Sequence, residues 1–154
     1  FSRGGFEPPR DVSTVTGLSN FAEVAARVGD ADAAARLHEA LLPWGGRMTF
    51  TGVGSWGAVD LYLGLCASTI GEYEQAENHF AEAQELHQRM DAPTWHARTQ
   101  HAWALMLLER DSGDDAERAR RMLEDALAVA QDRGCANLER EAREALEASA
   151  GAPS

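Results

Sequence analysis

The amino-acid sequence predicts an all-α domain in which pairs of helices follow one another along the chain. Apolar residues recur at spacings of three and four over most of the 154 residues, and this is the helical period. Glycine or proline interrupts the pattern at short intervals, for example at Gly29 and Pro43. β-Branched residues gather only around residues 11–16 and 48–53. Strand signals are therefore nearly absent, and we expect no sheet.

Seven helices are expected, as three pairs followed by a single helix. In chain order they cover residues 18–28, 31–42, 57–70, 73–90, 93–110, 115–133 and 136–150. Gly29 and Gly71 separate the helices of the first two pairs, and a turn with capping oxygens at 111–114 separates those of the third. Gly134 stands where a left-handed C-cap is expected. Residues 151–154 are expected to form a disordered tail.

Composition excludes several functional classes. The formal charge is −11, and all 14 basic residues are arginine. An acidic chain is repelled by nucleic acids and by anionic membranes, so neither is an expected partner. Without lysine there is no Schiff-base or P-loop lysine. Two cysteines, Cys66 and Cys135, are too few for a disulfide framework and indicate a cytoplasmic protein.

The first residues of the chain suggest that it is part of a larger protein. It starts at Phe1 with neither an initiator methionine nor a signal-peptide pattern. No uncharged run reaches the length of about 18 residues that a membrane span needs. We therefore expect a module of a cytoplasmic protein that does not contact a membrane.

The second helix pair contains a repeat pattern. Small residues at fixed positions would let its two helices approach closely, and aromatic residues would fill the space between one pair and the next. The matching residues are Leu63, Gly64, Ala67, Gly71, Tyr73, Ala76, Phe80 and Ala83. At every one of these positions the pair resembles the tetratricopeptide repeat (TPR), in a frame of about 34 residues.

The flanking pairs match the same frame less completely. The first pair contributes Phe21, Ala22, Ala25, Gly29, Ala34 and Leu41, with His38 at an aromatic position, and the third contributes Trp103, Ala104, Leu107, Ala119, Leu123 and Ala126. The resemblance implies a right-handed α-solenoid of three helix pairs that forms one domain over residues 1–150. Its parts are repeats at about 12–42, 57–90 and 92–133, a glycine-rich connection at 43–56 and a capping helix at 136–150.

A narrower resemblance covers most of the chain. Three motifs support it: an LLPxxGR connection, an APTWxART segment and the long third turn. With these motifs the chain is similar to the C-terminal TPR segments of large bacterial signalling ATPases, over residues 26–47, 63–110 and 113–134. In that family a P-loop ATPase precedes the repeats, and some members carry a nucleotide-cyclase domain or a LuxR-type helix-turn-helix. Neither the ATPase motif nor a DNA-reading helix is present in these residues. The resemblance therefore implies a sensory or scaffolding arm of a signalling or transcriptional regulator.

TPR arrays bind partners along the inner face of the first helix of each pair. The frame places on that face Glu23, Arg27, Leu61, Leu65, Ser68, Thr69, Arg98, His101, Leu105 and Glu109. The surface is expected to be mixed: apolar in its middle, with Arg27, Arg98 and His101 as donors and Glu23 and Glu109 as acceptors. It would suit a short peptide with one acidic anchor or another segment of the same protein. The alternative is that these residues pack against a neighbouring domain or face water.

The connection at 43–56 is the second candidate site. It contains four glycines and is expected to be irregular, with the large side chains of Trp44, Arg47, Phe50 and Trp56 on a flexible backbone. Long connections of this kind are often functional. It is expected either to fold over the end of the array or the groove, or to close over a ligand.

No catalytic, cofactor or metal site is predicted. The five histidines, His38, His79, His87, His96 and His101, lack the helical spacing of a ligand pair and are expected in the groove or on the surface. Cys66 is expected to be a small buried hydrophobe. The predicted function is non-catalytic recognition of a protein, a peptide or another domain of the same chain. Homo-oligomerisation through stacked array ends is the alternative, and an enzyme with an unrecognised site is a third reading.

Overall fold

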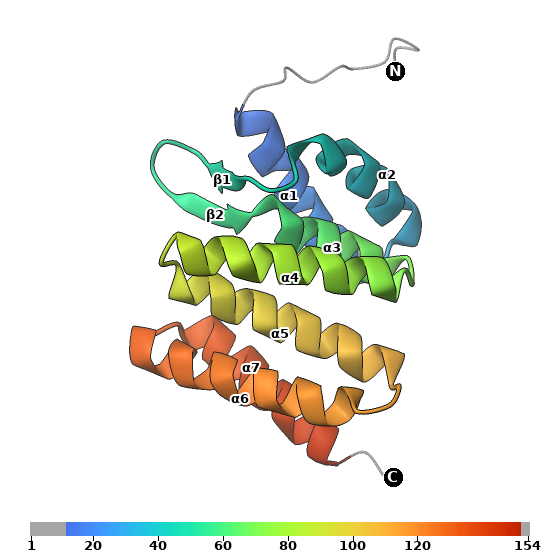
Figure 1. The fold of residues 1–154 in the computed structure, drawn as a ribbon, viewed down its shortest axis with the longest axis vertical. Coiled ribbons are helices and arrows are strands. Elements are labelled where there is room, and N and C mark those ends of the chain that lie inside the picture. Colours follow the sequence, from blue (N-terminus) through green and yellow to red (C-terminus); the bar gives the residue numbers. More distant parts are fainter. Residues whose placement is uncertain (1–11, 152–154) are drawn as a thin grey trace.

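The computed structural model describes residues 12–151, which are mostly helical (Figure 1). In chain order the elements are α1 (Val12–Val28), α2 (Ala31–Leu41), the 3-10 helix η1 (Leu42–Trp44), β1 (Met48–Phe50), β2 (Ser55–Ala58), α3 (Val59–Thr69), α4 (Tyr73–Arg89), α5 (Pro93–Arg110), α6 (Asp115–Arg133) and α7 (Ala136–Ala150). The prediction of an all-α class is confirmed at this level. Residues 1–11 of the expected domain, and all but Gly151 of the expected tail at 151–154, lie outside the described residues.

The helix boundaries follow the sequence pattern closely except at the first helix. From α3 onward every helix begins and ends within two residues of the expected position. Helix α1 begins at Val12, six residues before the expected start. Val15, Thr16 and Ser19 are buried in it. Burial of these side chains therefore outweighs the low helix propensity of valine and threonine.

The connection at 43–56 is not irregular, and the expectation of no sheet is wrong there. Strands β1 and β2 pair in an antiparallel hairpin. The Thr51 amide donates to the Gly54 carbonyl at 3.0 Å, and Gly52 takes a φ of +82° that glycine adopts freely. The Thr49 hydroxyl donates to the Gly57 carbonyl at 2.8 Å. Glycines and β-branched residues in this segment thus form a short turn with two strands.

The helices stack in chain order, with α1 and α2 at one end and α6 and α7 at the other (Figure 1). Helix α3 lies inside the stack and contacts α1, α2 and α4. Eight of its 11 residues are buried. One large hydrophobic core runs through these helices, from Val15 in α1 to Leu123 in α6.

The close approach of α3 and α4 depends on Gly64. A Cβ atom at this position would lie 2.6 Å from the ring of Phe80. The Phe80 ring is buried and stacks on Trp103 of α5, with 6.1 Å between ring centroids. Phe80 therefore joins the second helix pair to the third, and the absence of a side chain at Gly64 gives it the space to do so.

A group of ion pairs also joins α4, α5 and α6, and Trp103 donates to its member Glu77 at 3.3 Å. Arg110 donates two hydrogen bonds of 2.7 Å to Asp115 and one of 2.7 Å to Glu77, which also receives Arg118 at 2.7 Å. Hydrogen bonds from Arg110 lower the pKa of Asp115. Burial opposes ionisation of Glu77, but its hydrogen bonds with the two arginines outweigh this and lower its pKa. Arg110 and Arg118 therefore belong to a salt-bridged helix surface.

Gly64→Ala should destabilise the protein. The added methyl group overlaps a buried ring that Trp103 holds in place, and overpacking of this kind costs about 1–3 kcal/mol. This cost exceeds the gain in helix propensity of at most about 1 kcal/mol. We expect a net loss of up to about 2 kcal/mol in the free energy of unfolding, measured by urea denaturation.

Gly17→Ala in α1 is the matched control, because nothing lies within 4 Å of a Cβ at this position of the single chain. Both variants are measured at a protein concentration at which sedimentation shows a monomer. We expect it to raise the free energy of unfolding by about 0.5–1 kcal/mol. Equal effects of the two substitutions would show that Phe80 does not constrain Gly64.

Candidate binding groove

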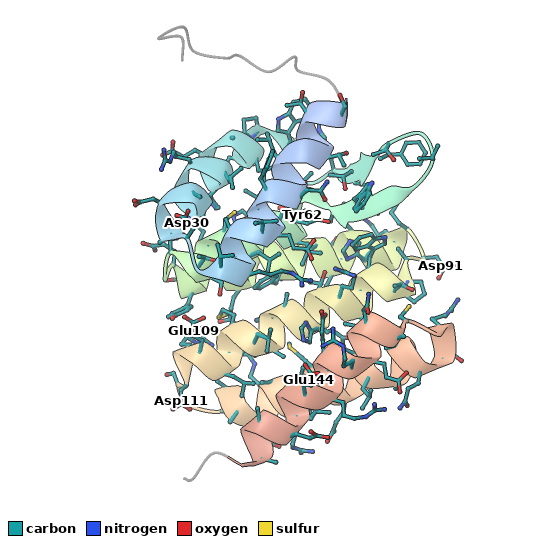
Figure 2. The ribbon with its side chains drawn as sticks, turned by 180° about the vertical axis from the view of Figure 1, so that it is seen from behind. Asp30, Tyr62, Asp91, Glu109, Asp111 and Glu144 are labelled. Carbon is teal, nitrogen blue, oxygen red and sulfur yellow. The ribbon has the colours of Figure 1, made fainter. Side chains whose placement is uncertain are left out.

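A groove with a cavity of about 700 Å³ lies between α1, α3, α5 and α7. Figure 2 looks onto the side of the molecule where α1 and α7 lie in front, with Tyr62 on α3, Glu109 at the end of α5 and Glu144 on α7. All ten candidate groove residues line this one cavity. They are Glu23, Arg27, Leu61, Leu65, Ser68, Thr69, Arg98, His101, Leu105 and Glu109.

Helix α7 also lines the groove, in addition to the capping role expected for residues 136–150. Its contribution is Leu138, Glu141, Glu144 and Ala145. An apolar stripe of Leu138, Ala142, Ala145 and Leu146 runs along the side of the helix that packs inward, where Leu138 and Ala142 are buried. The carboxylates beside that stripe were the signal that Glu141 and Glu144 could reach the groove, but their distance from α1 depends on the tertiary fold.

The middle of the groove is apolar. Leu61 and Met106 are buried, Leu65 is half-buried, and Leu105 is exposed. Ala102 and Ala145 add small side chains to the same lining. Apolar surface that remains in contact with water gains free energy when a partner covers it.

Both groove arginines already have acidic partners. Glu23 receives Arg27 at 3.0 Å and Arg98 at 3.4 Å. Arg27 also lies 3.7 Å from Glu141. These contacts join α1 to α5 and α7. The guanidinium of Arg98 lies 5.3 Å from the centroid of the Trp95 ring, within cation–π range.

The groove is more acidic than the mixed lining expected from the sequence, because α7 adds Glu141 and Glu144. Four carboxylates line the cavity (Glu23, Glu109, Glu141 and Glu144), against two guanidinium groups. Outside the lining, Arg140 pairs with Glu144 at 3.2 Å and lies 3.8 Å from Glu141. Among the described residues, Glu109 is therefore the carboxylate of the lining that has no arginine partner. Burial lowers the pKa of His101, so this ring is neutral at pH 7 and adds no positive charge. The expectation of an acidic anchor on the partner therefore lacks a free cation to receive it.

The most negative end of the groove lies where three helices end. Gly29 follows the C-terminus of α1, Thr69 is the last residue of α3 and Glu109 lies in the last turn of α5, and all three line the cavity. The C-terminus of a helix carries a partial negative charge. This end of the groove favours a cation.

The hairpin residues named as the second candidate site are separate from the groove. Trp44 is half-buried against the core, and Arg47 lies 5.6 Å from the centroid of its ring. Phe50 and Trp56 are exposed. None of the four lines the groove. The hairpin instead contacts α1 through β1, and α3, α4 and α5 through β2.

His87 holds the base of the hairpin. Its Nε2 accepts a hydrogen bond of 2.8 Å from the Ala58 amide, so the proton of the neutral ring is on Nδ1, which faces the Thr99 hydroxyl at 3.3 Å. That hydroxyl donates to the Trp95 carbonyl. Burial lowers the pKa of His87 to about 4. A protonated Nε2 could not accept from Ala58.

A second buried chain of polar groups fixes the start of the hairpin. The Gly46 amide donates to Asp60 at 2.6 Å, His79 Nδ1 lies 3.4 Å from the same carboxylate, and His79 Nε2 lies 3.3 Å from His38 Nε2. The chain links α2, α3 and α4. Within residues 12–151, no three His, Cys, Asp or Glu side chains are arranged so that they could hold a metal ion.

The histidine expectation needs correction at two positions. His38 and His87 are buried, not in the groove or on the surface. His38 contacts His79 of α4, and His87 accepts from the Ala58 amide of the hairpin. Spacing along a helix does not reveal contacts of this kind. Cys66 is a free, buried thiol as expected, and burial raises its pKa to about 12.

No protein-family model, no curated protein and no solved structure matches this chain. The geometry of the groove therefore carries the functional argument. None of the helices described between Val12 and Ala150 has the length and apolar character that crossing a membrane requires.

The stability of the protein should fall as the pH is lowered from 6.5 toward 4. The pKa of His87 is 6.5 in the unfolded chain and about 4 in the folded one. Its contribution is therefore complete above pH 6.5 and is lost progressively below it. The expected loss is about 3 kcal/mol, measured as the free energy of unfolding at a series of pH values.

His87→Gln is the test of this assignment, because glutamine retains an acceptor for the Ala58 amide but does not titrate. The variant should lose most of the pH dependence in this window, although His38 and His101, whose pKa values burial also lowers, contribute a remainder. A pH profile identical to that of the wild type would contradict the role of His87.

Proposed function

We propose that this chain is a non-catalytic recognition module that binds a segment of a partner protein in the groove between α1, α3, α5 and α7. The observation that supports this proposal most directly is that residues of four helices, of which Glu23 is the first and Ala145 the last, line one cavity with an apolar middle. Cavities of this size are typical of ligand and peptide sites. The proposal includes a TPR-like, right-handed arrangement of three helix pairs and a capping helix.

The pattern of burial supports the repeat. The small residues of the frame are buried in each of the three pairs, and they are Ala22, Ala25, Ala34, Gly64, Ala67, Ala76, Ala83, Ala104, Ala119 and Ala126. Phe80 occupies an aromatic position of the frame and fills the space between two pairs by stacking on Trp103. These are the roles that the repeat assigns to small and aromatic residues.

The chemistry of the groove defines the proposed partner. It is a segment with apolar side chains that cover Leu65 and Leu105, and with a lysine or arginine beside Glu109 and Glu144. The excess of carboxylates and the three helix C-termini favour this cation. We place the module in a bacterial cytoplasmic signalling or transcriptional regulator, where the bound segment belongs to another protein or to another domain of the same protein.

Two labelled peptides test the proposal by fluorescence anisotropy. They have the same length and the same leucines, and they differ only in carrying lysine or glutamate at the flanking positions. The lysine peptide should bind the more tightly. Glu109→Gln combined with Glu144→Gln should weaken its binding by about three- to tenfold, since each exposed charge pair contributes at most about 1 kcal/mol.

Glu74→Gln combined with Glu82→Gln is the matched control. It makes the same change in net charge at exposed positions of α4 that do not line the groove, and it should leave the affinity unchanged. Leu105→Ser should weaken the binding of both peptides. Equal binding of the two peptides, or equal effects of the two double variants, would overturn the proposed recognition.

A further inference from the structure

Helix α1 carries an apolar seam on the side that faces away from the core. Phe21, Val24 and Val28 are 65%, 56% and 71% exposed. Together with Gly17 they lie at spacings of four, three and four residues, which places all four on one face of the helix. This is the spacing of a seam between two packed helices.

The seam is free of charge although the chain is strongly acidic. Helix α1 contains one acidic and one basic residue, Glu23 and Arg27, and both line the groove. The formal charge of the whole chain is −11. A neutral apolar face on such a chain avoids the repulsion that opposes contact between two copies.

The equivalent face of a later helix is covered. In the repeat frame Phe21 corresponds to Trp103 of α5, and the Trp103 ring stacks on Phe80 of α4, in the preceding pair. The face of α1 that contains Phe21 is therefore of the kind that packs against another helix.

We propose that the seam of Gly17, Phe21, Val24 and Val28 is the interface of a symmetric dimer, in which α1 packs antiparallel against α1 of a second copy. The spacing of four, three and four residues reads the same in both directions. A twofold axis between Phe21 and Val24 therefore brings seam residues opposite seam residues.

The contacts are complementary in size. Phe21 faces Val24 of the partner subunit, and Gly17 leaves space opposite Val28 of the partner subunit. A Cβ at Gly17 would have nothing within 4 Å in the single copy. A seam on one helix of 17 residues, about 25 Å long, gives a small interface, so the dimer forms reversibly with concentration.

The other end of the stack cannot cover this seam. Arg140, Arg143, Glu144 and Glu147 are exposed on α7, and packing the α1 seam onto them would remove charges from water without compensation. A closed dimer through α1 therefore replaces the open stacking of both array ends. The seam and the groove occupy different faces of α1, so the dimer does not depend on the proposed peptide binding.

Sedimentation velocity over a concentration series tests the dimer. The wild-type protein should shift from monomer to dimer as concentration rises, and Val24→Glu should raise the dissociation constant at least about tenfold. The matched control is Val53→Glu, at a hairpin position that is 98% exposed, and it should leave the dimer intact. Circular dichroism verifies that both variants are folded.

Three results would overturn the proposal. They are a wild-type monomer at every concentration, a dimer that survives Val24→Glu, and a dimer that both variants abolish. Binding of the lysine peptide by Val24→Glu is measured in parallel, so that failure of the dimer and failure of the groove are distinguished.

Disulfide formation tests the antiparallel direction. In a Cys135→Ser background, protein carrying Gly17→Cys is mixed with protein carrying Val28→Cys and oxidised. A mixed disulfide between the two proteins is expected, with little linkage within either one alone. Efficient linkage of Gly17→Cys with itself would indicate parallel helices and would overturn the proposed register.

Discussion

The Phe80 ring lies against the backbone of Gly64, and the positions of the other helices depend on this contact. Because Gly64 has no side chain, α4 approaches α3 closely, and the same Phe80 ring stacks on Trp103 of α5. Helix α3 is thereby enclosed, with most of its residues buried. The spacing of the three helices in turn fixes the distance between α3 and α5, which form two sides of the groove.

Polar contacts fix the positions of elements that apolar packing alone does not orient. His87 receives the Ala58 amide, and Asp60 receives the Gly46 amide, so each end of the hairpin is held by a buried side chain from the helices. Buried polar groups without such partners would be costly. Arg110 and Asp115 have the corresponding role where they join α5 to α6. These contacts give each element one position relative to its neighbours.

Helix α1 has three surfaces with different chemistry. Ala22 and Ala25 are buried in the core, Glu23 and Arg27 line the groove, and Phe21 is exposed on the third side. The first surface holds the helix in place, and the second carries its only two charges. The lining of the groove and the exposed apolar seam of α1 therefore share no residue.

The sequence by itself determined the helices from α3 onward and the groove residues of α1, α3 and α5, because the helical period is local and places residues such as Leu61 and Leu65 on a known face. Only the tertiary structure decided the hairpin, the burial of His87 and the arrival of Glu141 beside Arg27. Each of these depends on contacts between residues far apart in the chain. Local spacing specifies which way a side chain points from its helix, but the partner that meets it, and hence its charge balance and protonation, follows from how the helices pack.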